Sequence, residues 1–185
     1  MIRVKVNQFG FTLIELIVVF SIIAILSLIG VAAFVSYGRM ATLDGASSDL
    51  SSVLLTAKSR ANSQVKPPST QIPQCNDQTV LDGYKVVLCP TANSNVICDK
   101  ANSYILGVVC GTSSCSDSLC SNIISQKIQE SVLPQDITFD SGTTSTLFFF
   151  PIISGGVGGA GKIILDGYGN QKTITVDSTG GIGIQ

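Results

Sequence analysis

Residues 10 to 26 read GFTLIELIVVFSIIAIL, and this stretch decides how the chain is organised. It places one carboxylate, Glu15, just before an apolar run, residues 16 to 35, that contains neither charge nor proline. A helix needs about 20 predominantly apolar residues to cross the hydrocarbon core of a bilayer. The sequence therefore predicts a membrane-spanning helix over residues 11 to 36.

The residues before the apolar run indicate its orientation. Arg3 and Lys5 lie on its N-terminal side, and positive residues that flank a membrane helix favour the cytoplasmic side. We expect a single-pass protein of the inner (cytoplasmic) membrane. Its N-terminus would lie in the cytoplasm and the rest of the chain outside it.

After the apolar run the pattern becomes that of an amphipathic helix over residues 37 to 66. Apolar or small residues recur every three or four positions, as on one helical face. They are Met40, Leu43, Ala46 or Ser47, Leu50, Val53, Leu54, Ala57 and Ala61. Pro67 and Pro68, the first prolines of the chain, should end this helix. We expect one helix from residue 11 to about residue 65, with its second half packed on a domain.

Residues 67 to 185 have the pattern of strands and turns and predict a β-rich head domain. Strands are expected over residues 83–89, 95–99, 103–110, 146–153, 161–166, 171–177 and 181–185, and a short helix over 123–130. The turn sequences DGYGN and DSTGG separate the last three strands, so these should form an antiparallel meander. The predicted fold class is α+β, a long N-terminal helix packed on an antiparallel sheet.

All cysteines of the chain lie in the predicted head. They are Cys75, Cys89, Cys98, Cys110, Cys115 and Cys120. An even number beyond a membrane span favours disulfides in an oxidising compartment, with a pairing that the sequence leaves open. Thiolate zinc is the competing interpretation, because Cys110, Cys115 and Cys120 are close together. However, the chain contains no CxxC pair, so we expect disulfides and no metal.

The composition argues against catalysis and against nucleic-acid binding. The chain has no histidine, which removes histidine-based triads and histidine metal ligands. Its net charge is −1 and it has no basic run, which does not favour nucleic acid. A small local patch of Lys58, Arg60 and Lys66 stays possible. We expect no enzyme activity and no cofactor.

Two further motifs have simpler explanations. GVGGAG at residues 156–161 matches GxGxxG, but a dinucleotide site needs a helix after it, and here a strand is expected. The stretch is therefore interpreted as a loop. Asp166, Asn170 and Asp177 could supply oxygen ligands to calcium. Asp, Asn and Gly are also the residues that tight turns require, and we favour turns.

Gly10 to Val19, GFTLIELIVV, closely resembles the N-terminal signature of type IV pilins and of the pseudopilins of type II secretion. The resemblance implies that a prepilin peptidase cuts between Gly10 and Phe11 and methylates the new amine of Phe11. It also implies that Glu15 pairs with the terminal amine of a neighbouring subunit. A carboxylate and an ammonium that are each unfavourable alone in apolar surroundings compensate each other at such an interface.

Later segments point to a subgroup. VLLTAKSRANSQ (residues 53–64) and the closing segment from residue 162 to residue 185 are similar to GspH/FimT-type minor pseudopilins and minor pilins. Six cysteines, and the lack of a proline in the membrane helix, depart from that group. The resemblance implies a minor structural subunit of a filament. Its partners would be other subunits, prepilin peptidase, and an inner-membrane assembly platform and ATPase.

A secreted or membrane-anchored, disulfide-bonded adhesion or binding domain is the alternative. In that case Arg3 and Lys5 would begin an ordinary signal peptide, and VAA at residues 31–33 would be its cleavage site. The apolar run is longer than the core of such a peptide, and this interpretation leaves GFTLIE unexplained.

Overall fold

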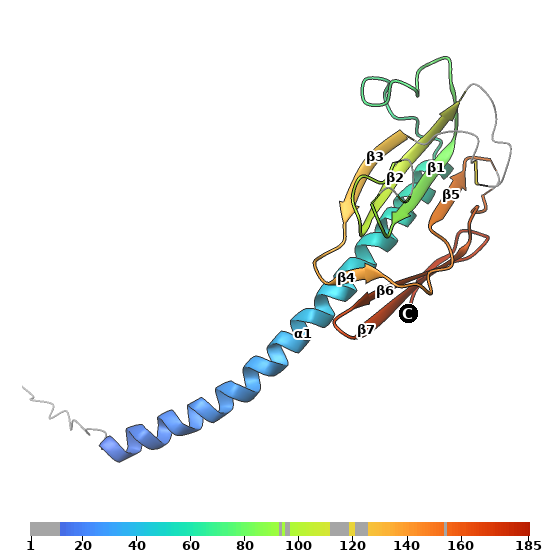
Figure 1. The fold of residues 1–185 in the computed structure, drawn as a ribbon. Coiled ribbons are helices and arrows are strands. Elements are labelled where there is room, and N and C mark those ends of the chain that lie inside the picture. The colour runs from blue at the N-terminus through green and yellow to red at the C-terminus, as the bar shows by residue number, and fades with distance from the viewer. Residues whose placement is uncertain (1–11, 93, 95–96, 112–118, 121–125, 154) are drawn as a thin grey trace, which may run out of the picture. The chain divides into compact units, whose positions relative to one another are not determined.

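A computed structural model of the chain contains one helix followed by β-strands (Figure 1). It describes residues 12–92, 94, 97–111, 119–120, 126–153 and 155–185. The helix is α1 (Leu13–Asn62), and the strands are β1 (Val80–Cys89), β2 (Ser103–Gly111), β3 (Gln126–Val132), β4 (Ile137–Phe139), β5 (Leu147–Pro151), β6 (Gly161–Gly167), β7 (Asn170–Val176) and β8 (Ile182–Ile184). The predicted α+β class is confirmed, and the predicted long helix is found.

The chain divides into two units, Met1–Arg39 and Met40–Gln185. In the first unit, every side chain from residue 12 to residue 27 is exposed, although most are apolar. No helix among the described residues combines the length and the apolar character that a membrane span requires. The span predicted over residues 11–36 includes positions outside the described set and stays a prediction. Residue 11 and the side chains at 28–30 and 32 lie outside the described set.

The second unit contains two four-stranded antiparallel sheets. Their strand orders are β3-β2-β1-β5 and β4-β6-β7-β8. The predicted meander is confirmed, because β6 pairs with β7 and β7 with β8. The β6–β7 connection is a two-residue hairpin in which Tyr168 and Gly169 have φ values of 57° and 76°. Two positive φ values are typical of a type I′ turn, whose twist matches that of the strands it joins.

One hydrophobic core joins the second half of α1 to both sheets. Leu43, Leu50 and Leu54 are at most 2% exposed, in the same cluster as Phe148 of β5 and Ile163 of β6. Complete burial of such a side chain contributes about 1.5–3 kcal/mol. The predicted helix face is confirmed from residue 43 to residue 61, with Val53 partly buried. Met40 was wrongly included, because it is 49% exposed.

α1 ends at Asn62, before the two prolines, in a Schellman motif. The Val65 amide donates to the Arg60 carbonyl at 3.1 Å, and the Gln64 amide donates to the Ala61 carbonyl at 3.0 Å. Gln64 has a φ of 51°, the left-handed conformation that this motif requires. Hydrogen bonds of the main chain thus end the helix at Asn62, and the two prolines lie beyond that end.

The prediction of a short helix over residues 123–130 was wrong for residues 126–130, which form β3; residues 123–125 lie outside the described set. In β3 exposure alternates, with Lys127 and Gln129 more exposed than Ile128 and Glu130. This is the period of a strand at the edge of a sheet. Pairing with β2 determines its structure.

Two other strand predictions need correction. Residues 97–99 of the predicted strand 95–99 are not in a strand, and residues 95 and 96 lie outside the described set. There Cys98 is buried through its disulfide with Cys89 and not through a strand ladder. β4 was not predicted, because its three residues are too few to show a period.

Candidate functional site

The first turn of α1 carries Glu15 together with Thr12. The Leu16 amide donates to the Thr12 carbonyl at 3.2 Å, which is the first hydrogen bond of the helix. The Glu15 amide donates to Thr12 Oγ1 at 3.4 Å. Thr12 is therefore the N-cap residue and Glu15 the third helical residue, which is the Thr-x-x-Glu spacing of a capping box. This capping role was not predicted, although the letters TLIE at residues 12–15 are its signal.

Glu15 occupies a position where a carboxylate suits the helix. An acidic group in the first turn interacts favourably with the positive end of the helix dipole. Glu15 is exposed, and its neighbours Leu13, Ile14 and Leu16 are exposed as well. The structure thus presents one carboxylate beside an uncovered apolar surface, where it can accept an ammonium group. Gly10 and Phe11, the predicted processing residues, lie outside the described residues.

Two disulfides have both partners among the described residues. Cys75 is bonded to Cys110, which ties the segment after α1 to β2, and Cys89 is bonded to Cys98. Cys120 is also disulfide-bonded. Cys115 lies outside the described residues. Disulfides are what the even number of cysteines predicted.

The residues considered for calcium, Asp166, Asn170 and Asp177, lie next to the β6–β7 and β7–β8 turns. Asp177 Oδ1 accepts hydrogen bonds from the Thr179 hydroxyl at 2.6 Å, the Thr179 amide at 2.8 Å and the Gly181 amide at 2.7 Å. The Thr179 hydroxyl is the largest cause that lowers the Asp177 pKa below its usual range. Asp166 and Asn170 belong to the β6–β7 hairpin. Within the described part of the chain, no group of three or more Cys, Asp or Glu side chains could hold a metal ion.

The loop with the GxGxxG match leads into a strand. Gly161 is the first residue of β6. A dinucleotide site of this type needs a helix at that point. The interpretation of this stretch as a loop therefore agrees with the structure for residues 156–160.

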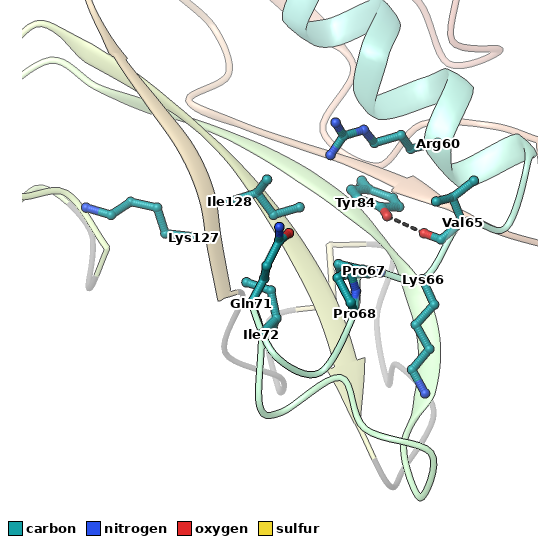
Figure 2. A pocket seen from close by; sticks show the side chains of 10 residues that line it. All are labelled: Arg60, Val65, Lys66, Pro67, Pro68, Gln71, Ile72, Tyr84, Lys127 and Ile128. Carbon is teal, nitrogen blue, oxygen red and sulfur yellow. Dashed lines mark hydrogen bonds between the residues drawn. The ribbon is translucent and has the colours of Figure 1, made fainter.

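The small basic patch is divided between two places. Lys58 Nζ donates to the Gly180 carbonyl at 2.8 Å, in the turn between β7 and β8. Arg60 and Lys66 instead line a groove of about 610 Å³ beside the end of α1. The ten residues that line this groove are Arg60, Val65, Lys66, Pro67, Pro68, Gln71, Ile72, Tyr84, Lys127 and Ile128 (Figure 2). The sequence did not predict this groove, because β3, which was expected to be a helix, supplies one of its walls.

Tyr84 forms the buried part of this groove. It is 1% exposed, and its hydroxyl donates to the Val65 carbonyl (Figure 2). Burial raises the pKa of the Tyr84 phenol, and the positive charge of Arg60 opposes part of that rise. The phenol therefore remains a neutral donor that holds the chain after α1 against β1.

Comparison with known proteins adds one finding. Residues 5–31 match the model of the prokaryotic N-terminal methylation motif. Neither a curated protein nor a solved structure matches the chain. The matched residues include Gly10, Phe11, Thr12 and Glu15.

Proposed function

We propose that the chain is a minor structural subunit of a type IV pilus or of a type II secretion pseudopilus. The methylation motif at residues 5–31 carries this proposal and supports processing by a prepilin peptidase. The α+β fold, a long helix with an antiparallel head, agrees with a pilin-like architecture. Such a subunit contributes contacts to a filament and performs no chemistry.

In this proposal, processing and assembly give a separate role to each part of the chain. Residues 1–10 are the leader, which the peptidase removes between Gly10 and Phe11 before it methylates the Phe11 amine. Residues 11–36 hold the subunit in the inner membrane and later pack among neighbouring helices in the filament. Residues 37–66 continue this helix into the head, and residues 67–185 form a disulfide-bonded head outside the cytoplasm.

Glu15 has two roles in this proposal. Its main-chain amide belongs to the helix cap with Thr12. Its carboxylate pairs with the methylated amine of Phe11 in an adjacent subunit. The two roles separate experimentally, because glutamine serves a capping box as well as glutamate does but carries no charge.

Substitutions at the first turn test the proposal. Glu15→Gln should still be cleaved, yet enter filaments at about one tenth of the wild-type level or less, since loss of about 1.4 kcal/mol of contact energy is a tenfold change. Thr12→Val removes the helix cap and keeps the Glu15 charge, so it should reduce incorporation into filaments less than Glu15→Gln does. The measurement is immunoblotting of sheared filaments against membrane-retained protein. Incorporation of Glu15→Gln at the wild-type level would contradict the proposed pairing of Glu15 with the Phe11 amine.

A further inference from the structure

The groove beside the end of α1 contains a cation that no described residue neutralises. Arg60 is half-buried, and its guanidinium forms neither an ion pair nor a hydrogen bond with any residue of the described chain. In the view of Figure 2 its side chain is drawn above that of Tyr84. No acidic residue is among the described residues that line the groove. A guanidinium in this position has a full set of donors available to a ligand.

The other two cations of the groove are already engaged. Lys66 Nζ donates to the carbonyls of Asn76 and Thr79, the latter at 2.6 Å. Lys127 Nζ lies 2.5 Å from Asp99 Oδ2 and 3.2 Å from Glu130 Oε2. In Figure 2 its side chain extends away from the other labelled residues. Of the three cations among the described lining residues, Arg60 is thus the one without a described hydrogen-bond or ion-pair partner.

The remaining lining is mostly apolar. Ile128, Ile72, Pro67 and Pro68 provide aliphatic surface next to Arg60. Prolines lack amide hydrogens, so this wall presents little competing polarity. A volume of about 610 Å³ lies within the range of sites that hold small ligands or short peptide segments.

We propose that this groove binds an acidic, extended segment of a partner protein. One carboxylate of the segment accepts a bidentate pair of hydrogen bonds from the Arg60 guanidinium, and the flanking aliphatic side chains pack on Ile128 and the two prolines. Paired donors in a planar fork match the geometry of a carboxylate. This inference goes beyond filament assembly and does not depend on it.

The observations favour a peptide over single-stranded nucleic acid. Such nucleic-acid sites combine several free cations along the backbone with exposed aromatic rings on which bases stack. Here Tyr84, the only aromatic side chain among the described residues that line the groove, is 1% exposed. Lys127 is already paired with Asp99 and Glu130, so it does not supply a second free cation for a chain of phosphates.

Peptide binding to the full chain in non-ionic detergent tests the proposal. The probes are end-blocked, fluorescein-labelled hexapeptides with one central glutamate flanked by Leu, Ile, Val or Pro, their glutamine counterparts, and an oligothymidine. Fluorescence anisotropy should show that glutamate peptides bind at least about tenfold more tightly than glutamine peptides, as expected for charged hydrogen bonds.

Variants locate the site. Arg60→Gln should weaken glutamate-peptide binding about tenfold, and Arg60→Lys should weaken it less, because lysine keeps the charge but loses the fork. Lys162→Gln, which removes an exposed cation of β6 outside the groove, should change affinity less than twofold. Circular dichroism verifies that each variant is folded. Two results with the peptides alone would overturn the proposal: equal binding of both peptide types, or no saturable binding. Wild-type binding by Arg60→Gln would also overturn it, as would Arg60-dependent binding of the oligothymidine in place of the peptides.

Discussion

Tyr84 of β1 donates a hydrogen bond to the carbonyl of Val65, whose own amide closes the Schellman motif at the end of α1. Both polar main-chain groups of Val65 are therefore satisfied within the head. One side chain of the first sheet determines the path that the chain takes when it leaves the helix. Because this contact joins segments far apart in sequence, it should matter to the stability of the whole head.

Tyr84→Phe should lower the free energy of unfolding of the head by about 0.5–1.5 kcal/mol, because the Val65 carbonyl loses its donor while the ring remains in the core. Urea unfolding of the full chain in non-ionic detergent, followed by near-ultraviolet circular dichroism, measures this change. Tyr37→Phe is the matched control, because Tyr37 is 73% exposed. A similar loss in both variants would contradict the role given to the buried hydroxyl.

Lys58→Met should destabilise the head by about 1 kcal/mol, because the Gly180 carbonyl loses its donor. Methionine keeps most of the aliphatic stem, which lies against Gly180 in the turn between β7 and β8. Hydrogen exchange of the amides from Thr179 to Gly183 should rise in this variant. Lys162→Met, on exposed β6 surface, should leave that exchange as in wild type. Unchanged exchange in Lys58→Met would show that the turn holds without the lysine.

Asp177 should make the stability of the head depend on acidity. Its pKa in the folded chain lies below the ordinary value of 3.8, so its contribution is complete above that value and is lost as the pH falls through the lowered pKa. Wild-type protein should lose more stability than Asp177→Asn between about pH 5 and pH 2. Thr179→Val, which removes one of the three donors, should lie between them. Identical slopes in thermal unfolding across this range would contradict the assignment.

The disulfides Cys75–Cys110 and Cys89–Cys98 should contribute unequally to stability. Cys75–Cys110 closes a longer loop than Cys89–Cys98, with sequence separations of 35 and 9. On loop entropy, the first should stabilise by about 4 kcal/mol and the second by about 3 kcal/mol. Urea unfolding of the paired serine variants Cys75→Ser/Cys110→Ser and Cys89→Ser/Cys98→Ser measures the difference. A larger loss in the second variant would mean that loop length does not govern these bonds.

Much of the fold could be predicted because its signals are local. The three-to-four-residue period from Leu43 to Ala61 correctly predicted the buried helix face, and the turns DGYGN and DSTGG correctly predicted the C-terminal meander. β3 was mistaken for a helix because its sequence is polar. Its strand structure depends on its position at the edge of the sheet, where it pairs with β2.

The candidate sites also differ in whether the sequence could predict them. The helix cap could have been predicted, because Thr12 and Glu15 are three residues apart in a known pattern. The groove could not, because Arg60, Tyr84 and Ile128 meet only after β1 and β3 have joined one sheet beside α1. The partners of Cys75 and Cys89 were also unpredictable, since six cysteines permit many pairings.

We propose that the chain is cleaved after Gly10 and assembled through the helix that follows. N-terminal sequencing with mass spectrometry of the mature protein, purified from cells that contain a prepilin peptidase, tests this proposal. We expect a first residue of N-methylated Phe11. A mature protein that begins near Phe34, as an ordinary signal peptide would leave it, or one that retains residues 1–10, would contradict the claim.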